Sequence, residues 1–231
     1  YELKKISRIC KISANSPITA DEFQLKYNCD TTFIPTSSIQ RSDFLETRKL
    51  KDNKAVNIIF VGRVVHDKGI EELIEAYLKF KHHRDVPVTL NIIGGVNQIY
   101  EQKIKTKYQL NMHNVYFRKF INFGEELMML YDSADVFVLP SYHEGFPHSI
   151  WEAASRRVPV ITTKVGGIPG LINESMVTYI KTKDVDSIVC ALKLVIKGSK
   201  EIENKTENLY GCALNYTVDK CAMKLIDELQ R

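Results

Sequence analysis

The sequence has few of the features that mark specialised protein classes. Its five cysteines are an odd number, without a C-x-x-C pair and without a His/Cys spacing typical of zinc sites. No apolar run approaches the ~20 residues that a membrane-spanning helix needs, and the first residues lack the long apolar core of a signal peptide. The sequence therefore predicts free thiols in a reducing compartment, the cytoplasm, and argues against a disulfide framework, a zinc module or an integral membrane protein.

Strong net charge is also missing. The chain has 32 basic and 28 acidic residues, a formal net charge of +4, which is too small to indicate nucleic-acid binding. A charge of this size suits a ligand that carries phosphate, or an anionic membrane surface. Hydrophobic residues make up 44% of the 231 residues, so the chain can bury the core of one or two globular domains.

From residue 57 onward, short apolar segments alternate with amphipathic ones. The segments 57–62 (NIIFVG), 88–95 (VTLNIIGG) and 136–140 (VFVLP) are typical of buried strands, and helical periodicity follows. This alternation predicts an α/β fold with a Rossmann-like, doubly wound parallel sheet. The strand order is left open. Ligands bind such sheets beyond the carboxyl ends of the strands. Four loops should gather there: 62–69, 94–97, 140–148 and 163–170.

The two ends of the chain differ from this central part. Residues 1–50 do not read as a complete domain: 19–22 (TADE) has capping-box form and would open a short helix, and 29–35 suits a strand. Residues 41–55 are polar and read as a linker. Residues 198–216 are polar and predict irregular structure, whereas the last segment predicts a helix with an apolar stripe.

The segment 141–171 holds two carboxylates, Glu144 and Glu152, with seven residues between them. Glu144 falls in a loop after a strand, and Glu152 about two turns into the next helix, near whose first turn stands Pro147. The free amides of that turn suit an anion, usually phosphate. The pair could serve as general acid and base, or a carboxylate could accept hydrogen bonds from ribose hydroxyls. Ordinary turn and helix positions are the alternative.

Two cations, Arg63 and Lys68, flank a strand-to-helix turn that has Gly69 at the helix start. Two cations beside free helix amides can neutralise a diphosphate, and arginine can bind it in bidentate fashion. Solvated loop cations are the alternative. The pattern is not a Walker loop, and no G-x-G-x-x-G follows the first strand, which argues against a dinucleotide-binding dehydrogenase.

Other patterns in the same loops have less specific interpretations. Gly166 and Gly167 follow a strand and allow either a close approach of two backbones or a plain turn. Asp184 and Asp186 form a D-x-D pattern that can bind metal, but it opens an amphipathic helix, so capping explains it better. Three histidines are more often surface or capping residues than catalysts: His66, His143 and His148.

Together these segments resemble a known family. The resemblance is to the nucleotide-sugar half of retaining glycosyltransferases of family 4, the glycosyl transferases group 1. It implies one half of a GT-B fold, in which two Rossmann-like domains face a cleft. The similar segments are VGRVVHDKGIEELIEAY (61–77), LNIIGG (90–95), YDSADVFVLPSYHEGFPHSIWEAAS (131–155) and VPVITTKVGGIPGLI (158–172).

The resemblance implies three parts. Residues 1–50 would be the remnant of the N-terminal domain and the crossover linker. Residues 51–200 would be the nucleotide-sugar-binding Rossmann-like domain, and 201–231 a helical segment that returns toward the N-terminal domain. Most of the acceptor domain is then missing, so we expect an incomplete fragment that binds donor without transferring sugar.

The resemblance also assigns roles to residues. Arg63 and Lys68 would hold the donor diphosphate, and Glu152 would bind the ribose. Glu144 would lie at the donor sugar as a catalytic group, together with Arg63 and Lys68. Residues beside it would complete the donor site: Gly145, Phe146 and Pro147. No cofactor and no metal are expected, because arginine and lysine replace the cation. In two places the chain departs from the family, which often has glycine at Lys119, near the base pocket, and at Arg157.

The implied reaction is the transfer of a sugar, with retention, from a nucleoside diphosphate sugar to a hydroxyl. The acceptor would be a glycan or lipid-linked sugar held by the missing domain, in surface glycan or glycolipid synthesis. No nucleic acid is expected; peripheral contact with the inner face of the membrane would occur through the missing domain. The alternatives are a non-catalytic nucleotide-sugar-binding module and a GT-B-like epimerase or phosphorylase.

Overall fold

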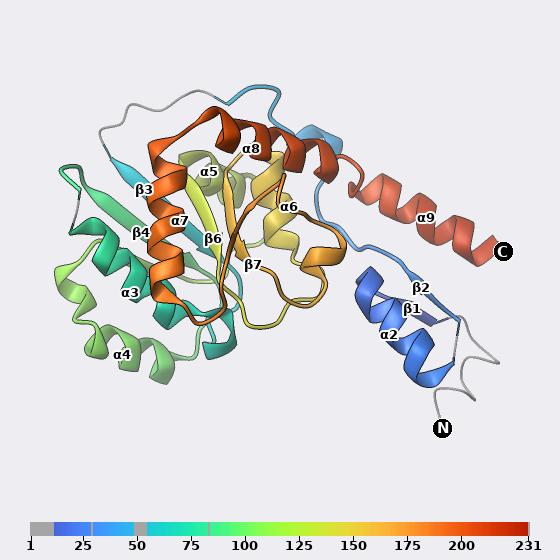
Figure 1. Ribbon diagram of the computed structural model, residues 1–231, viewed down its shortest axis with the longest axis horizontal. Helices are drawn as coiled ribbons and strands as arrows, with labels where there is room; N and C mark the ends of the chain where they lie inside the picture. Colours follow the sequence, from blue (N-terminus) through green and yellow to red (C-terminus); the bar gives the residue numbers. More distant parts are fainter. Residues whose placement is uncertain (1–11, 29, 49–54, 83, 231) are drawn as a thin grey trace.

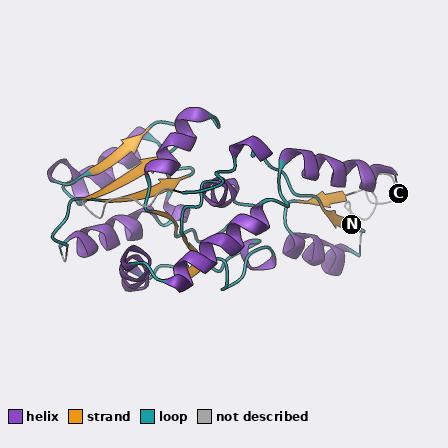
Figure 2. Cartoon of the chain, turned by 90° about the horizontal axis from the view of Figure 1, so that it is seen from above, coloured by secondary structure: helices purple, strands orange, loops and turns teal. Residues whose placement is uncertain are grey.

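The computed structural model describes residues 12–28, 30–48, 55–82 and 84–230. Its main body is a six-stranded sheet, in which every pairing is parallel and the order is β5-β4-β3-β6-β7-β8. Helices cover both faces of this sheet (Figures 1 and 2). The doubly wound prediction is therefore confirmed, and the order reverses direction between β3 and β6. The strands are β3 (Val56–Val61), β4 (Val88–Ile93), β5 (Val115–Arg118), β6 (Val136–Leu139), β7 (Val160–Thr163) and β8 (Thr178–Ile180).

The central strands are buried on both faces. All four residues of β6 are buried, and so are Ile58 and Phe60 of β3. Near-continuous apolar runs of this kind are typical of parallel strands that helices cover on both sides. The register pairs Ile58 with Val136, which sets the carboxyl ends of β3 and β6 next to each other.

The helices of the main body begin and end near the predicted boundaries. Helix α3 packs beside α7, and α5 beside α6. One boundary differs: the helix expected to reach Leu110 ends at Lys107, because Gln109 has a left-handed φ of +49° and a short 3-10 turn follows. The helices are α3 (Ile70–Lys81), α4 (Gln98–Lys107), α5 (Glu125–Ser133), α6 (His148–Ser155) and α7 (Val185–Lys197).

The prediction of irregular structure for residues 198–216 is wrong. A helix, α8 (Lys200–Ala213), occupies this segment, and the Ser199 side chain caps it by accepting a hydrogen bond from the backbone N–H of Ile202. The hydrophobic periodicity of this segment is weak, because the buried stripe of α8 is one residue wide and includes a threonine. Its members are Ile202, Thr206, Leu209 and Ala213.

A glycine near the end of α8 offers a test of this helix. Gly211 is helical, and a Cβ placed on it meets nothing within 4 Å. Gly211→Ala should therefore raise the free energy of unfolding by about 0.5–1 kcal/mol, measured by urea denaturation. Gly198 adjoins the same helix in equally open space, but its φ is +71°, so Gly198→Ala should lower that free energy. A decrease in the free energy of unfolding in both variants would contradict the helical conformation of Gly211.

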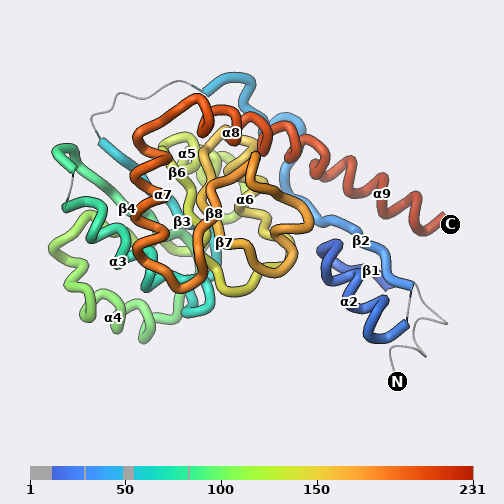
Figure 3. Tube along the Cα trace, in the orientation of Figure 1, coloured from blue at the N-terminus to red at the C-terminus, as the bar shows by residue number. Residues whose placement is uncertain are grey.

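The first part of the chain forms a separate βαβ unit. Strand β1 (Ile12–Ala14) pairs in parallel with β2 (Thr31–Phe33), and α2 (Pro17–Tyr27) connects them. The unit lies to one side of the main sheet, with α9 (Val218–Gln230) running toward it (Figures 1 and 3). Helix α2 begins earlier than the predicted Thr19, because Ser16 caps it: the Ser16 hydroxyl accepts from the Thr19 backbone N–H at 3.1 Å.

Helix α9 carries the predicted apolar stripe and leaves most of it exposed. Only Cys221 is buried, while Lys224 lies 4.5 Å above the ring of Phe33 in β2. The exposed apolar side chains include Val218, Met223, Leu225, Ile226 and Leu229.

The structure also shows the state of three cysteines and the length and hydropathy of the helices. Cys190, Cys212 and Cys221 are free thiols, whereas Cys10, Cys29 and residues 49–54 of the predicted linker lie outside the described residues. Across the described ranges, no helix is both long enough and apolar enough to cross a bilayer.

Candidate functional site

A cavity of about 380 Å³ opens at the carboxyl ends of β3, β4 and β6. The loops after these strands form its walls, as predicted for a parallel sheet. Most of the predicted site residues line it: Arg63, Lys68, Glu144, Phe146, Pro147 and Glu152. Gly145 does not line it; a Cβ at that position would instead lie 2.9 Å from the Asn15 side-chain amide.

A buried ion pair stands in this cavity. The Lys68 Nζ lies 2.5 Å from Glu144 Oε1, and the two side chains are 13% and 9% exposed. The Ser141 hydroxyl donates a hydrogen bond to the same carboxylate oxygen at 2.6 Å. Before a ligand arrives, Glu144 therefore neutralises Lys68 in surroundings where screening by water is weak.

Backbone contacts fix the loop that carries Lys68. Lys68 ends a short 3-10 turn, η2 (His66–Lys68), and Gly69 follows with a φ of +67°. A Cβ on Gly69 would lie 2.3 Å from the Pro140 carbonyl oxygen, and the Tyr142 N–H donates to the Asp67 carbonyl at 2.8 Å. The loops after β3 and β6 consequently pack so closely that only a glycine fits at position 69.

The Gly166-Gly167 pair makes the close backbone approach that the sequence allowed. The Gly167 N–H donates to the Glu144 carbonyl oxygen at 2.9 Å. Gly166 has a φ of +54°, and a Cβ there would lie 1.8 Å from that carbonyl oxygen. The loop after β7 therefore supports the Glu144 backbone from behind.

Glu152 lies deeper in the cavity. It is 7% exposed, and it stands one turn into α6 rather than two, because the helix begins at His148 and Pro147 occupies the cap position. The Tyr131 hydroxyl donates to Glu152 Oε2 at 2.9 Å, and the Ser38 hydroxyl lies 3.5 Å from Oε1. Burial raises the pKa of the Glu152 carboxyl, and these two hydrogen bonds oppose the rise.

The rest of the cavity wall is partly cationic and partly apolar. The Arg63 side chain is exposed at the cavity and has no ion-pair partner among the residues that the structure describes. Pro147 supplies no side-chain acceptor to the first turn of α6. The Ile150 N–H donates to the Pro147 carbonyl at 3.1 Å, so the earlier N–H groups of this turn are the ones that an anion could engage. Four apolar side chains form another part of the wall: Phe120, Ile121, Phe123 and Leu127.

The D-x-D pattern is a helix cap, as expected. The Asp184 side chain accepts a hydrogen bond from the Ser187 N–H at 2.9 Å, and Asp186 pairs with Lys79 at 2.8 Å on the surface. In the described ranges, no group of three or more His, Cys, Asp or Glu side chains could hold a metal ion. His66, His143 and His148 are all exposed, and His148 also lines the cavity, with its Nε2 3.3 Å from the Thr36 hydroxyl.

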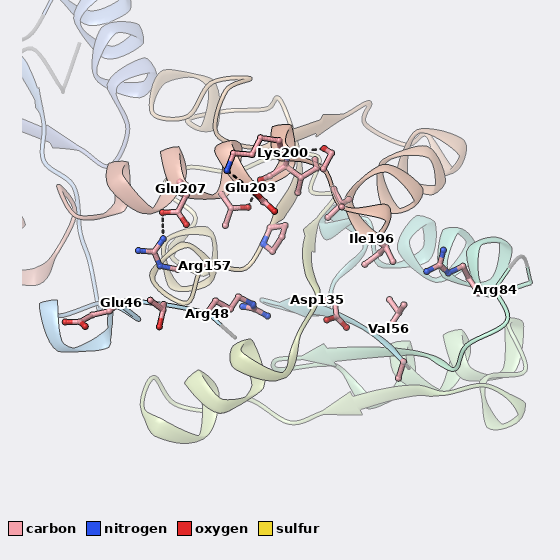
Figure 4. Close-up of a pocket in the computed structure, with 18 residues that line it drawn as sticks. Glu46, Arg48, Val56, Arg84, Asp135, Arg157, Ile196, Lys200, Glu203 and Glu207 are labelled. Carbon is pink, nitrogen blue, oxygen red and sulfur yellow. Dashed lines mark hydrogen bonds and ion pairs between the residues drawn. The ribbon is translucent and has the colours of Figure 1, made fainter. Parts of the chain in front are cut away.

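A larger cavity, of about 550 Å³, lies at the amino ends of the strands (Figure 4). Several of its charged side chains already have partners in the protein: Arg157 pairs with Glu207, and Lys200 pairs with Glu203. Arg48 donates to the Arg156 carbonyl at 2.8 Å. Because ligands of open α/β sheets bind at the carboxyl ends, the smaller cavity is the candidate site.

Three residues around the carboxylates were not predicted from the sequence. They are Ser141, in the segment 141–171, Tyr131, at the start of the segment 131–155, and Ser38, within residues 1–50. Tyr131 and Ser38 are far from Glu152 in the sequence, and folding alone brings them together. Only the position of Ser141, directly after a strand in the same loop as Glu144, could have indicated its contact.

The order of the sheet defines a Rossmann-like α/β domain, and the candidate cavity lies at the switch point between β3 and β6. The profile of one family, "Glycosyl transferases group 1", matches residues 42–210. The chain therefore belongs to the glycosyl transferases group 1 family, as the sequence motifs indicated.

Two curated relatives show how much of a family member the chain represents. It is 30% identical over 194 residues to "Uncharacterized glycosyltransferase MJ1607" of Methanocaldococcus jannaschii, covering 81% of this chain and 48% of the relative. It is 31% identical over 239 residues to "Capsular polysaccharide biosynthesis glycosyltransferase CapM" of Staphylococcus aureus, covering 89% of this chain and 60% of the relative. The chain thus spans roughly half the length of these proteins.

Solved structures share the fold. The C-terminal domain of a glycosyl transferase group 1 protein (LpcC) from Francisella tularensis matches with a TM-score of 0.66 and 22% identity, over 78% of this chain and 100% of that domain. Anabaena HepE, solved with UDP and glucose, matches with a TM-score of 0.79 and 17% identity, over 95% of this chain and 63% of HepE. The main body accordingly has the fold of a GT-B C-terminal half.

Proposed function

We propose that this chain is the donor-binding half of a retaining glycosyltransferase that takes a nucleoside diphosphate sugar. One observation supports this most: two cations and two carboxylates meet in a single cavity at the switch point of the sheet. They are Arg63, Lys68, Glu144 and Glu152. Membership of the glycosyl transferases group 1 family points the same way.

The parts of the cavity suit the parts of such a donor. The diphosphate would bind Arg63 and Lys68 beside the first-turn amides of α6, and the ribose hydroxyls would donate to Glu152. The base would lie against the apolar wall that includes Phe120. The sugar would lie at Glu144, next to the backbone of 145–146.

In the proposed reaction, the bond between the sugar carbon and the diphosphate oxygen breaks. The acceptor hydroxyl attacks from the same face, and its proton passes to the leaving phosphate. Lys68 and Arg63 stabilise the negative charge that develops on the diphosphate, which is usually a large catalytic contribution. The acceptor contacts would come from the N-terminal half of a complete family member.

The biological role that we propose is the synthesis of a surface polysaccharide or glycolipid at the cytoplasmic face of the membrane. It is supported by CapM, whose description names capsular polysaccharide biosynthesis. HepE, which shares the fold and was solved with UDP and glucose, supports a nucleotide-sugar donor.

Donor binding without metal is the direct test. Calorimetry with UDP, GDP and ADP should show binding of at least one of them, with an affinity that EDTA leaves unchanged, because Arg63 and Lys68 supply the positive charge. The matching nucleosides should bind much more weakly. Binding that appears only with Mg²⁺ or Mn²⁺ would contradict the metal-free site, and no binding of any diphosphate would overturn the proposed function.

A further inference from the structure

Tyr131 is a fully buried side chain that donates a hydrogen bond to Glu152, one of the two carboxylates of the candidate site. It lies on α5, with its hydroxyl 2.9 Å from Glu152 Oε2 and 3.3 Å from the Ser149 carbonyl oxygen. Its ring is 0% exposed and packs 5.9 Å from that of Phe137 in β6. The ring is therefore anchored in the core while the hydroxyl reaches the cavity wall.

The direction of this hydrogen bond is settled by chemistry. Burial and the adjacent Glu152 carboxylate hold the pKa of Tyr131 well above its usual range, so the hydroxyl keeps its proton. Of the two acceptors within reach, the carboxylate oxygen is nearer, and an ionised oxygen accepts more strongly than a carbonyl. Tyr131 therefore donates to Glu152.

A donor on one carboxylate oxygen determines where the other one lies. The last torsion of a glutamate side chain is broad, so packing alone sets the carboxylate plane poorly. Oε2 is held by Tyr131, whereas the one partner of Oε1 among the described residues is the Ser38 hydroxyl, at 3.5 Å, near the limit of hydrogen bonding. Oε1 is thus the oxygen left to accept from a ligand.

We propose that Tyr131 is a positioning residue for the donor ribose: its hydroxyl fixes the Glu152 carboxylate so that Oε1 is available to a ribose hydroxyl. This inference rests on the proposed function, since it takes Glu152 as the ribose acceptor. Tyr131 itself does not touch the nucleotide.

The test compares ribose and dideoxyribose ligands in matched variants. Tyr131→Phe removes the hydroxyl and keeps the ring. The control is Tyr77→Phe. Tyr77 lies on α3, is also fully buried and does not line the cavity, and its hydroxyl donates a hydrogen bond to the Val88 carbonyl at 3.0 Å. Calorimetry is done with UDP, GDP and ADP and with their 2',3'-dideoxy counterparts.

Tyr131→Phe should weaken binding of the ribonucleotide about tenfold, an effect in the range for a hydrogen bond to a charged group. The dideoxy ligand should bind this variant and the wild type equally well. Tyr77→Phe should leave both affinities unchanged. A Tyr131→Phe/Glu152→Gln double variant should bind no more weakly than Glu152→Gln alone, because both changes act on one contact.

Several results would overturn the proposal. Unchanged ribonucleotide binding in Tyr131→Phe would do so, and so would equal losses for the ribose and dideoxy ligands, which indicate a general structural role. Ser38→Ala serves as a second variant and should change affinity by less than about twofold, given its long contact; a tenfold loss there would move the positioning role to Ser38. Failure of the wild type to bind any diphosphate would instead reject the proposed function itself.

Discussion

Gly166→Ala is expected to abolish measurable donor binding. The φ of Gly166 is +54°, which costs an L-residue about 1–2 kcal/mol. The new Cβ would also lie 1.8 Å from the Glu144 carbonyl oxygen, so either the loop after β7 or the loop that carries Glu144 has to move. A displacement of about 1 Å in a site can cost a hundredfold in function. Calorimetry with UDP, GDP and ADP measures the loss.

A second glycine separates the effect of the clash from that of backbone strain. Gly198 has a similar φ, +71°, but a Cβ there meets nothing within 4 Å. Gly198→Ala should therefore cost about 1–2 kcal/mol of stability and leave nucleotide affinity unchanged. If Gly166→Ala binds as well as Gly198→Ala does, then the loop after β7 does not support the donor site.

Lys68→Ala should cause the other large effect, a loss of both stability and diphosphate binding. The Lys68–Glu144 pair is almost buried, and removal of one partner from a buried pair costs about 3–5 kcal/mol, because the remaining charge is left uncompensated. Urea denaturation should show this loss. Affinity for nucleoside diphosphates should fall far more than affinity for nucleosides, since the lysine serves the phosphates.

Two further variants distinguish these roles of Lys68. In the double variant Lys68→Ala/Glu144→Gln the unpaired charge is gone, so most of the stability should return while diphosphate binding stays weak. Lys79→Ala breaks a pair with Asp186 whose side chains are 55% and 80% exposed, and it should leave the free energy of unfolding nearly unchanged, because exposed ion pairs contribute little. Equal losses for diphosphates and nucleosides in Lys68→Ala would contradict the assignment of Lys68 to the phosphates.

The features of the fold and the site that could be predicted are those that depend on local residue patterns. Apolar runs such as 136–140 predicted buried strands, and the rule that ligands bind at the carboxyl ends of parallel strands placed Arg63, Lys68 and Glu144 at one edge. The strand order could not be predicted, because it depends on which strands pair at long range. The carboxylate spacing predicted Glu152 on a helix, but its depth in that helix depended on where Pro147 ended the loop.

The failures have a common cause, which is that tertiary packing outweighed a weak local signal. Helix α8 buries one narrow stripe, so its sequence reads as polar although α6 covers that stripe. The contacts of Tyr131 and Ser38 with Glu152 join three segments that no spacing rule connects. The hydroxyl groups that contact a buried carboxylate are therefore determined by the whole fold and not by a local sequence pattern.

The pairing of Lys68 with Glu144 also bears on which anions can compete for the site. A ligand has to offer Lys68 more than the single negative charge that already lies 2.5 Å from it. A monovalent anion, such as chloride, gains little from this exchange, because it would leave the Glu144 carboxylate without its partner. A diphosphate carries several negative charges and can also engage Arg63 and the α6 amides, so it can compensate for separating the pair. In the proposed donor site, the ion pair would therefore favour polyvalent phosphates over monovalent anions.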